Sequence, residues 1–184
     1  MYRHCTTEKT SKQQLQFQEA LLAIMQECAY NDISVVDLCN STGLSRNVFY
    51  RLFDCKDDVL LALIDHRFLE CNQFASSSNI KKNLTLYFTY WRQQEKLLYA
   101  LEKENLSELL TARATLCFSQ IDFGLIRHIN SDWKKYDKEI LTFYIHGFVG
   151  LLLHWYRTGF ARSEKEMFTI AFQFLDIPPF SFHS

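Results

Sequence analysis

Residues 34–56 read SVVDLCNSTGLSRNVFYRLFDCK, and this segment contains the pattern of two short amphipathic helices joined by a tight turn. Ser34 is placed as an N-cap for the first helix, and Gly43 stands where a glycine commonly ends a helix. After Leu44, Ser45 is a second N-cap. The spacing therefore predicts a helix-turn-helix over about residues 34–53, and an ordinary helical hairpin is the alternative.

The residues on both sides of this segment also have helical periodicity. Before it, residues 17–28 place apolar side chains at intervals of three and four, as one face of a helix does. After it, a long amphipathic helix is expected over about residues 55–75. Two short helices braced by a longer one describe a helix-turn-helix of the DNA-binding kind.

The predicted second helix of the pair carries polar groups that suit DNA. These groups cluster at its start and along its exposed edge, and they are Ser45, Arg46, Asn47, Tyr50 and Arg51. A helix that enters a major groove needs donors at these places, because they must reach phosphates and base edges. This surface favours DNA binding over a plain helical hairpin.

The composition of the whole chain indicates an all-α fold. Of its 184 residues 48% are apolar, and only five are glycine and two are proline. So many apolar residues can bury a sizeable core, which excludes a disordered chain. So few turn-forming residues cannot punctuate a many-stranded sandwich or barrel. We therefore expect an all-α protein.

Helical periodicity continues in the second half of the chain. The Ser-Ser-Ser-Asn stretch at 76–79 predicts a boundary between a DNA-binding domain, 1–75, and a helical domain, 76–184. Further helices are expected at about 80–93, 95–103, 106–129 and 137–158, and from 163 to the Pro178-Pro179 pair. The helix at 137–158 is apolar nearly all round and must be buried on most sides. A twofold subunit interface would cover it, and burial within one monomer is the alternative.

Motifs for catalysis or metal binding are absent from the sequence. The six cysteines are scattered without a CxxC pair, so we expect reduced packing residues. His146 and His154 have no acidic or cysteine residue at metal-binding spacing, and His128 has only Asp132, four residues on. Phosphate-loop, dinucleotide and nucleophile-elbow motifs do not occur. We expect a protein that is not an enzyme and binds no metal or cofactor.

The sequence gives no sign of export or of a membrane partner. The amino terminus has no apolar signal segment, and the longest nearly uninterrupted apolar run, 147–156, is about half the length that a membrane helix needs. We therefore expect a cytoplasmic protein.

Residues 34–56 resemble the DNA-binding signature of the TetR/AcrR family of transcriptional regulators. The matching elements are Ser34, the Gly43-Leu44-Ser45 turn, Phe49-Tyr50, Phe53, and Lys56 followed by a long amphipathic helix. The resemblance covers roughly residues 15–68, and the closing Trp155-x-x-x-Gly159 helix pair is also similar. The chain departs from the family at Ala29, Cys39 and Asn47-Val48, so the base preference of another member does not transfer to it.

The resemblance implies roles for the matching residues. Ser34 and Lys56 would hold phosphates, and Tyr50 would place its hydroxyl on the DNA backbone. Arg46 and Asn47 would reach base edges, since Arg suits guanine and Asn suits adenine. Val48 would meet a thymine methyl, Arg51 a phosphate or a base, and Val36 the groove. The expected DNA-binding set is Ser34, Val36, Ser45, Arg46, Asn47, Val48, Tyr50, Arg51 and Lys56.

The charge of the amino-terminal region limits how strongly it attracts DNA. Residues 1–70 hold seven basic and ten acidic side chains, a net charge of −3, although a DNA contact face is expected to be basic. A net negative charge is compatible with a basic contact face if the acids Asp57, Asp58, Asp65 and Glu70 lie away from the DNA. The basic side chains left toward DNA would be Arg3, Lys9, Lys12, Arg46, Arg51 and Lys56. We expect weak non-specific binding.

The resemblance further implies that residues 76–184 form a regulatory and dimerisation region, with the last two helices of each subunit in a four-helix bundle. Aromatic side chains could line an effector pocket there, since such pockets are mostly apolar. The candidates are Phe88, Trp91, Phe118, Tyr144 and Phe148. An aromatic core without a pocket is the alternative.

Together these features predict a homodimeric repressor that a small ligand of unknown identity releases from a palindromic operator in double-stranded DNA. Two alternatives stay open. The first is a family member that acts as an activator or through a protein co-regulator, without a small-molecule effector. The second is a helical interaction module that has lost DNA binding.

Overall fold

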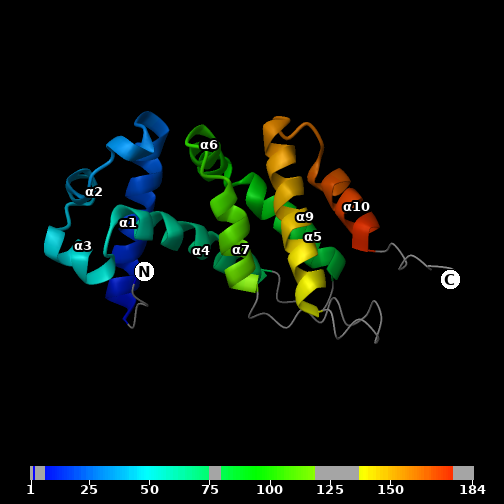
Figure 1. Cartoon of the computed structure of the whole chain (residues 1–184), viewed down its shortest axis with the longest axis horizontal. Helices are drawn as coiled ribbons and strands as arrows, with labels where there is room; N and C mark the ends of the chain where they lie inside the picture. Colours follow the sequence, from blue (N-terminus) through cyan, green and yellow to red (C-terminus); the bar gives the residue numbers. More distant parts are fainter. Residues whose placement is uncertain (1, 3–6, 75–79, 119–136, 176–184) are drawn as a thin grey trace. The chain divides into compact units, whose positions relative to one another are not determined.

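The computed structural model describes residue 2 and residues 7–74, 80–118 and 137–175. These residues form helices and contain no strand, so the predicted all-α fold is confirmed (Figure 1). The elements are α1 (Glu8–Glu27), the 3-10 turn η1 (Tyr30–Asp32), α2 (Val35–Thr42), α3 (Arg46–Leu52), α4 (Lys56–Phe74), α5 (Ile80–Arg92), α6 (Glu95–Lys103), α7 (Glu108–Phe118), α9 (Asp137–Arg157) and α10 (Glu164–Leu175).

The helices group into two compact units. Unit 1 consists of Met1–Leu69 and Glu95–Gln120, and unit 2 consists of Glu70–Gln94 and Ile121–Ser184. Unit 1 therefore joins α6 and α7 to the helix-turn-helix. The division into functional domains 1–75 and 76–184 stays a prediction, and the serine-rich stretch at 76–79 lies outside the described residues.

Three aromatic rings form the centre of the helix-turn-helix. Phe17 of α1 contacts Phe49 of α3 edge-on, with ring centroids 5.3 Å apart, and lies 6.1 Å from Phe53. All three side chains are fully buried. Because α3 is only seven residues long, it owes its stability to this packing rather than to its intrinsic helix propensity.

Local signals fix the ends of α2 and α3, as the sequence predicts. The hydroxyl of Ser34 accepts from the backbone N–H of Asp37, and the Asp37 carboxylate accepts from the Ser34 backbone, which completes a capping box. Gly43 ends α2 in the left-handed conformation, with φ +68°. Ser45 then caps α3 through the backbone N–H of Val48.

Polar contacts bind α6 and α7 to the rest of unit 1. Gln26 of α1 donates to the backbone carbonyl of Lys96 at 3.2 Å, and Lys103 donates to the carbonyl of Met25 at 3.3 Å. Arg113 of α7 forms an ion pair with Asp65 of α4. These contacts make α6 and α7 part of the body that carries the helix-turn-helix.

Unit 2 has a core of large aromatic side chains between α5, α9 and α10. Phe88 and Trp91 of α5 and Trp155 of α9 are essentially fully buried. Phe88 meets Trp155 edge-on at 5.7 Å. The Arg92 guanidinium at the end of α5 lies over the rings of Trp155 and Phe160, at 5.7 and 5.3 Å from their centroids.

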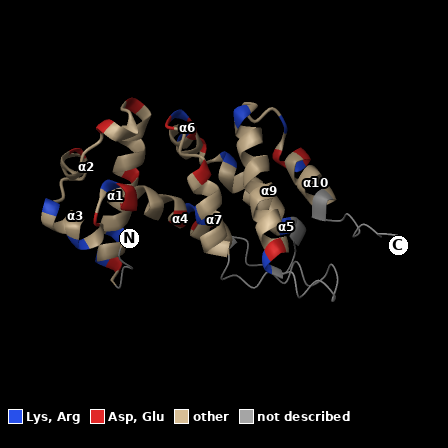
Figure 2. Ribbon diagram, in the orientation of Figure 1, with Lys and Arg blue, Asp and Glu red and all other residues tan. Residues whose placement is uncertain are grey.

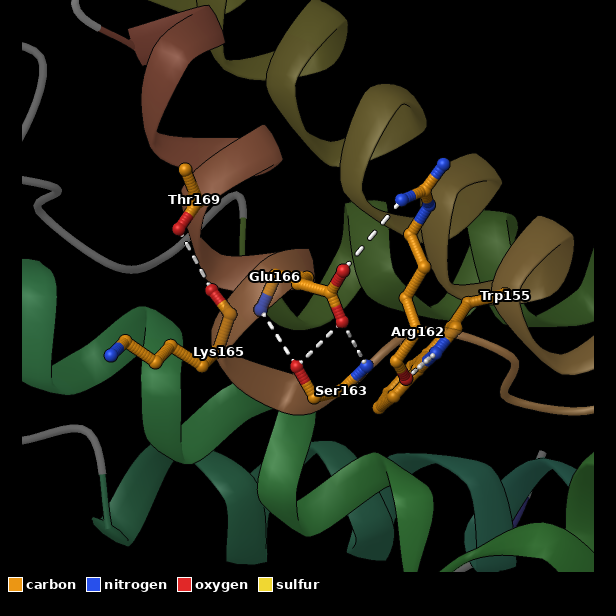
Figure 3. Close-up of polar contacts among 6 residues, drawn as sticks. All are labelled: Trp155, Arg162, Ser163, Lys165, Glu166 and Thr169. Atoms are coloured by element: carbon orange, nitrogen blue, oxygen red, sulfur yellow. Dashed lines mark hydrogen bonds and ion pairs between the residues drawn. The ribbon is translucent and has the colours of Figure 1, made fainter.

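Polar contacts hold the corner between α9 and α10 (Figure 3). The indole of Trp155 donates to the backbone carbonyl of Arg162 at 2.8 Å. Ser163 and Glu166 form a capping box at the start of α10, as their spacing predicts. The hydrogen bonds from Ser163 hold the pKa of Glu166 below its ordinary value. This corner is therefore a defined turn rather than a loose connection.

No helix in the described ranges is long and apolar enough to cross a membrane.

The helix predicted for 106–129 is observed as far as Phe118, and its remaining residues lie outside the described part of the chain.

Candidate nucleic-acid interface

The helix α3 presents a polar face to solvent and an apolar face to the core. Arg46, Asn47 and Arg51 are exposed, and 51% of Tyr50 is accessible. On the opposite face Phe49 and Leu52 are buried. A short rigid helix with donors along one side has the form that a major groove can admit.

The remaining predicted contact residues of the α2–α3 motif lie around this face. Ser34 and Ser45 are exposed, and both also cap helices through their hydroxyl oxygens. Val36 on α2 is 39% exposed, an unusual position for a valine, while Val48 is half-buried. The thymine-methyl contact of Val48 and the groove contact of Val36 stay predictions.

The ring of Tyr50 is held at a fixed angle. It meets the buried ring of Phe49 edge-on, with centroids 5.3 Å apart and planes at 87°. Edge-to-face pairs of this kind are favourable. About half of the Tyr50 side chain remains accessible to solvent beside this contact.

Arg51 is linked to α1 by a contact that the sequence did not predict. Its guanidinium donates to the side-chain oxygen of Gln13 at 3.0 Å. The two residues are 38 positions apart, so no local spacing rule connects them. This contact places the first turns of α1 beside α3.

Lys56 lies at the start of α4 and faces η1. Its ammonium donates to the backbone carbonyl of Tyr30 and lies 4.2 Å from the centroid of the Tyr30 ring. The hydroxyl of Tyr30 donates to Asp57 at 2.5 Å. Burial, followed by this hydrogen bond, raises the pKa of Tyr30 well above its ordinary value. Lys56 is therefore positioned by the protein itself, and its phosphate contact stays a prediction.

The acids of α4 are used within the protein. Asp58 and Asp65 are only 4% and 5% exposed, and Glu70 accepts from the hydroxyl of Tyr90 at 2.8 Å. Basic residues, in contrast, occur on α3 and near the start of α1 (Figure 2). Although residues 1–70 carry a net negative charge, the exposed face of α3 is therefore basic.

The five predicted pocket residues do not all belong to one unit. Phe88 and Trp91 are completely buried in unit 2, where Tyr144 and Phe148 stack at 6.2 Å. Phe118 belongs to unit 1, where its ring packs against Phe68 at 5.6 Å. In unit 2 the hydroxyl of Tyr87 also approaches the backbone carbonyl of Phe148 at 3.5 Å. The effector pocket stays a prediction.

The histidines of the described residues show no metal-binding arrangement. His146 contacts the carbonyl of Thr142 at 2.8 Å through its Nδ1, and His154 is exposed on the same helix. Within the described ranges no group of three or more His, Cys, Asp or Glu side chains could hold a metal ion. His128 lies outside those ranges.

Comparisons with known proteins identify related regulators. Residues 78–176 match a TetR family model described as "Transcriptional regulator C-terminal region". No curated protein sequence matches the chain.

Solved structures share the fold at low sequence identity. A TetR transcriptional regulator from Streptococcus agalactiae is 15% identical with a TM-score of 0.67, and the match covers 91% of this chain and 95% of that one. The dihydroxyacetone kinase operon activator DhaS is 17% identical with a TM-score of 0.63, covering 88% and 93%. The fatty acid degradation regulator FadR from Bacillus halodurans is 16% identical with a TM-score of 0.58, covering 94% and 96%.

Proposed function

Because this chain belongs to the TetR family of transcriptional regulators, we propose that it is a dimeric, sequence-specific repressor that a small ligand releases from a palindromic operator. The observation that carries the proposal is the exposed polar face of α3 on a fully buried aromatic base. A repressor of this kind acts in the cytoplasm on chromosomal DNA and performs no catalytic step.

Each exposed side chain of α3 suits one kind of DNA contact. Arg46 and Asn47, in the first turn, are the base-reading residues. An arginine can donate to two acceptors of a guanine, and an asparagine can donate to one group of an adenine and accept from another. Tyr50, Ser34 and Lys56 contact phosphates and set the register of the helix in the groove. Substituting a base-reading residue should relax sequence preference, whereas substituting a phosphate contact should weaken binding to all sequences.

Dimerisation is proposed through α9 and α10. Phe143 on α9 is 70% exposed, although large aromatic side chains are usually buried. Gly147 and Gly150 follow on the same side of the helix, and a Cβ added to either would meet nothing within 4 Å. An apolar face that the described residues leave exposed suits a twofold interface, in which the same patch of two subunits pairs with itself.

Ligand control follows from the dimer. The two recognition helices must match successive major grooves, about 34 Å apart, for both half-sites to be bound. A ligand in unit 2 that favours a dimer with another spacing would release the operator by shifting the population of states. Phe88, Trp91, Tyr144 and Phe148 are the described residues of unit 2 proposed to line its site.

A second candidate function is activation of transcription. One of the structures that share this fold is named as an operon activator, and it covers 88% of the chain. The DNA-binding surface would be the same in an activator, and the difference would lie in what unit 2 contacts. Such a protein could work through a protein co-regulator rather than a small ligand.

The proposal is tested by selecting bound genomic fragments with the purified protein. The wild type should enrich a palindrome, whereas an Arg46→Ala, Tyr50→Phe double variant should not. An Arg162→Ala variant, altered on an exposed side chain of unit 2, is the matched control and should enrich the same palindrome. If a folded wild-type dimer enriches nothing at low salt, DNA binding by the free protein is contradicted.

The dimer is tested separately by sedimentation. Phe143→Glu should give a folded monomer, because a charge at the proposed twofold interface would be buried without a partner. Tyr99→Glu changes a 43% exposed aromatic of unit 1 in the same way and should leave the dimer intact. A Phe143→Glu protein that sediments as a dimer would contradict this interface.

A further inference from the structure

The first turns of α1 form a basic surface beside the recognition helix. Lys9, Lys12, Gln13 and Gln16 recur at intervals of three and four residues, so they share one side of the helix. The side-chain oxygen of Gln13 accepts a hydrogen bond from the Arg51 guanidinium at 3.0 Å, so this side of α1 lies next to α3. Lys9 and Lys12 are therefore held next to the predicted DNA contacts. We refer to Lys9, Lys12 and Gln13 as the α1 edge.

The α1 edge belongs to a well-formed helix rather than to a loose terminus. The hydroxyl of Thr7 accepts from the backbone N–H of Thr10, and the Thr10 hydroxyl accepts from the backbone of Thr7, each at 3.3 Å. Ser11 continues the helix with a backbone hydrogen bond to the carbonyl of Thr7 at 3.1 Å. This capping box fixes the backbone that carries both lysines.

The ammonium groups of the α1 edge are available to an anion. Both lysines are exposed, and in the described part of the chain neither forms an ion pair. Glu8 is an acid in the same turn and lies four residues before Lys12. Glu19, farther along α1, is already paired with Arg67 of α4. The edge thus carries an excess of positive charge beside α3.

We propose that the α1 edge is a second DNA contact, in which Lys9 and Lys12 bind phosphates that flank the bases read by α3. Their positions differ by three residues, so both ammonium groups extend from one side of α1 and can reach phosphates of the same stretch of backbone. Gln13 is a positioning residue, because it holds Arg51 between the two surfaces. The inference rests on the proposed DNA-binding function.

The surface also accounts for how an acidic region could bind DNA. Residues 1–70 carry a net charge of −3, yet two acids of α4 are buried and others are hydrogen-bonded. Adding two lysines to the exposed arginines of α3 gives four basic groups on the side that would face DNA. Phosphate neutralisation depends on these local groups rather than on the charge of the whole region.

The test measures the salt dependence of binding to a fixed 40-base-pair duplex of mixed sequence, which requires no knowledge of the operator. Lys9→Gln and Lys12→Gln should each lower the slope of log K against log salt by about 0.9 per subunit, the value for one phosphate contact. Lys96→Gln removes an exposed lysine from α6, which packs at the opposite end of α1, and should leave the slope unchanged.

The outcomes separate this inference from the function on which it rests. If the wild type enriches a palindrome from genomic fragments and the Arg46→Ala, Tyr50→Phe variant does not, but the Lys9 and Lys12 variants keep the wild-type slope, the α1 edge is not a DNA contact and the proposed function stands. If the wild type neither binds the duplex nor enriches genomic fragments, the proposed function fails and the inference fails with it. Circular dichroism of each variant shows that a reduced slope is not a folding defect.

Discussion

The carboxylate of Asp65 on α4 and the guanidinium of Arg113 on α7 form a two-pronged ion pair. Arg113 donates through Nε to one oxygen at 2.6 Å and through a terminal nitrogen to the other. The hydroxyl of Tyr2 also donates to Asp65. The two charged side chains are only 7% and 20% exposed, so the pair lies largely out of water. It joins α7 to α4, the helix that follows α3.

Removing one partner of this pair should destabilise unit 1. Arg113→Leu would leave the buried Asp65 carboxylate without its cation, which typically costs about 3 kcal/mol of unfolding free energy. Urea unfolding measures this loss. The Arg162–Glu166 pair of unit 2 is 60% and 56% exposed, so Arg162→Leu should cost well under about 1 kcal/mol. Equal losses in the two variants would contradict the importance of burial.

The turn of the helix-turn-helix should require glycine at position 43. With φ +68°, any side chain there is strained, even though a Cβ would meet nothing within 4 Å. Gly43→Ala should therefore lower the unfolding free energy by about 1 kcal/mol. Gly43→Asn should cost less, because asparagine tolerates the left-handed conformation. Thermal unfolding of both variants checks this order. A Gly43→Ala protein as stable as the wild type would contradict it.

The capping box of α2 should make stability depend on acid pH. Hydrogen bonds from the Ser34 side chain and backbone hold the pKa of Asp37 below its ordinary value. A depressed folded pKa adds stability above the unfolded pKa, about 3.9, and this is lost as pH falls through the folded value. Between pH 5 and 2.5 Asp37→Asn should therefore lose stability less steeply than the wild type. If Asp37→Asn lost stability as steeply as the wild type, the capping box would not be the source of this pH dependence.

The cysteines should differ widely in reactivity. Burial raises the pKa of Cys71 to about 12, and burial followed by the nearby Asp65 charge raises that of Cys117 to about 12. A raised pKa means less thiolate at pH 8, and the thiolate is the reactive form. Iodoacetamide should therefore label exposed Cys28 and Cys55 at least ~100-fold faster than Cys71. Mass spectrometry of quenched samples measures the rates, which should converge in urea.

Local chemistry made the helix-turn-helix predictable. Ser34, Gly43 and Ser45 mark helix ends by contacts with residues at most four positions away, so a sequence pattern contains all the information needed. The apolar spacing of α1 likewise predicted which face of that helix is buried, and Phe17 on this face meets Phe49 and Phe53 in the core. The exposed polar face of α3 follows from the same periodicity.

The contacts around that face were not predictable. Gln13 meets Arg51 across 38 positions, and Lys56 meets the carbonyl of Tyr30 across 26. Phe118 was grouped with four other aromatics by residue type, yet it belongs to another unit. Pairings of this kind depend on how the helices pack. Apolar periodicity predicts that a side chain is buried, but it does not predict which residues it packs against.

The sequence alone indicated the helices, the caps at Ser34, Ser45 and Ser163, the turn at Gly43 and the family of the protein, because each depends on residues that are close together in the chain. The tertiary structure alone decided which charges face solvent. It buries Asp58 and Asp65, pairs Asp65 with Arg113 across 48 positions, and leaves Lys9 and Lys12 exposed beside Arg51. Side-chain charge is a property of the sequence, but the surface to which it contributes depends on packing between distant segments.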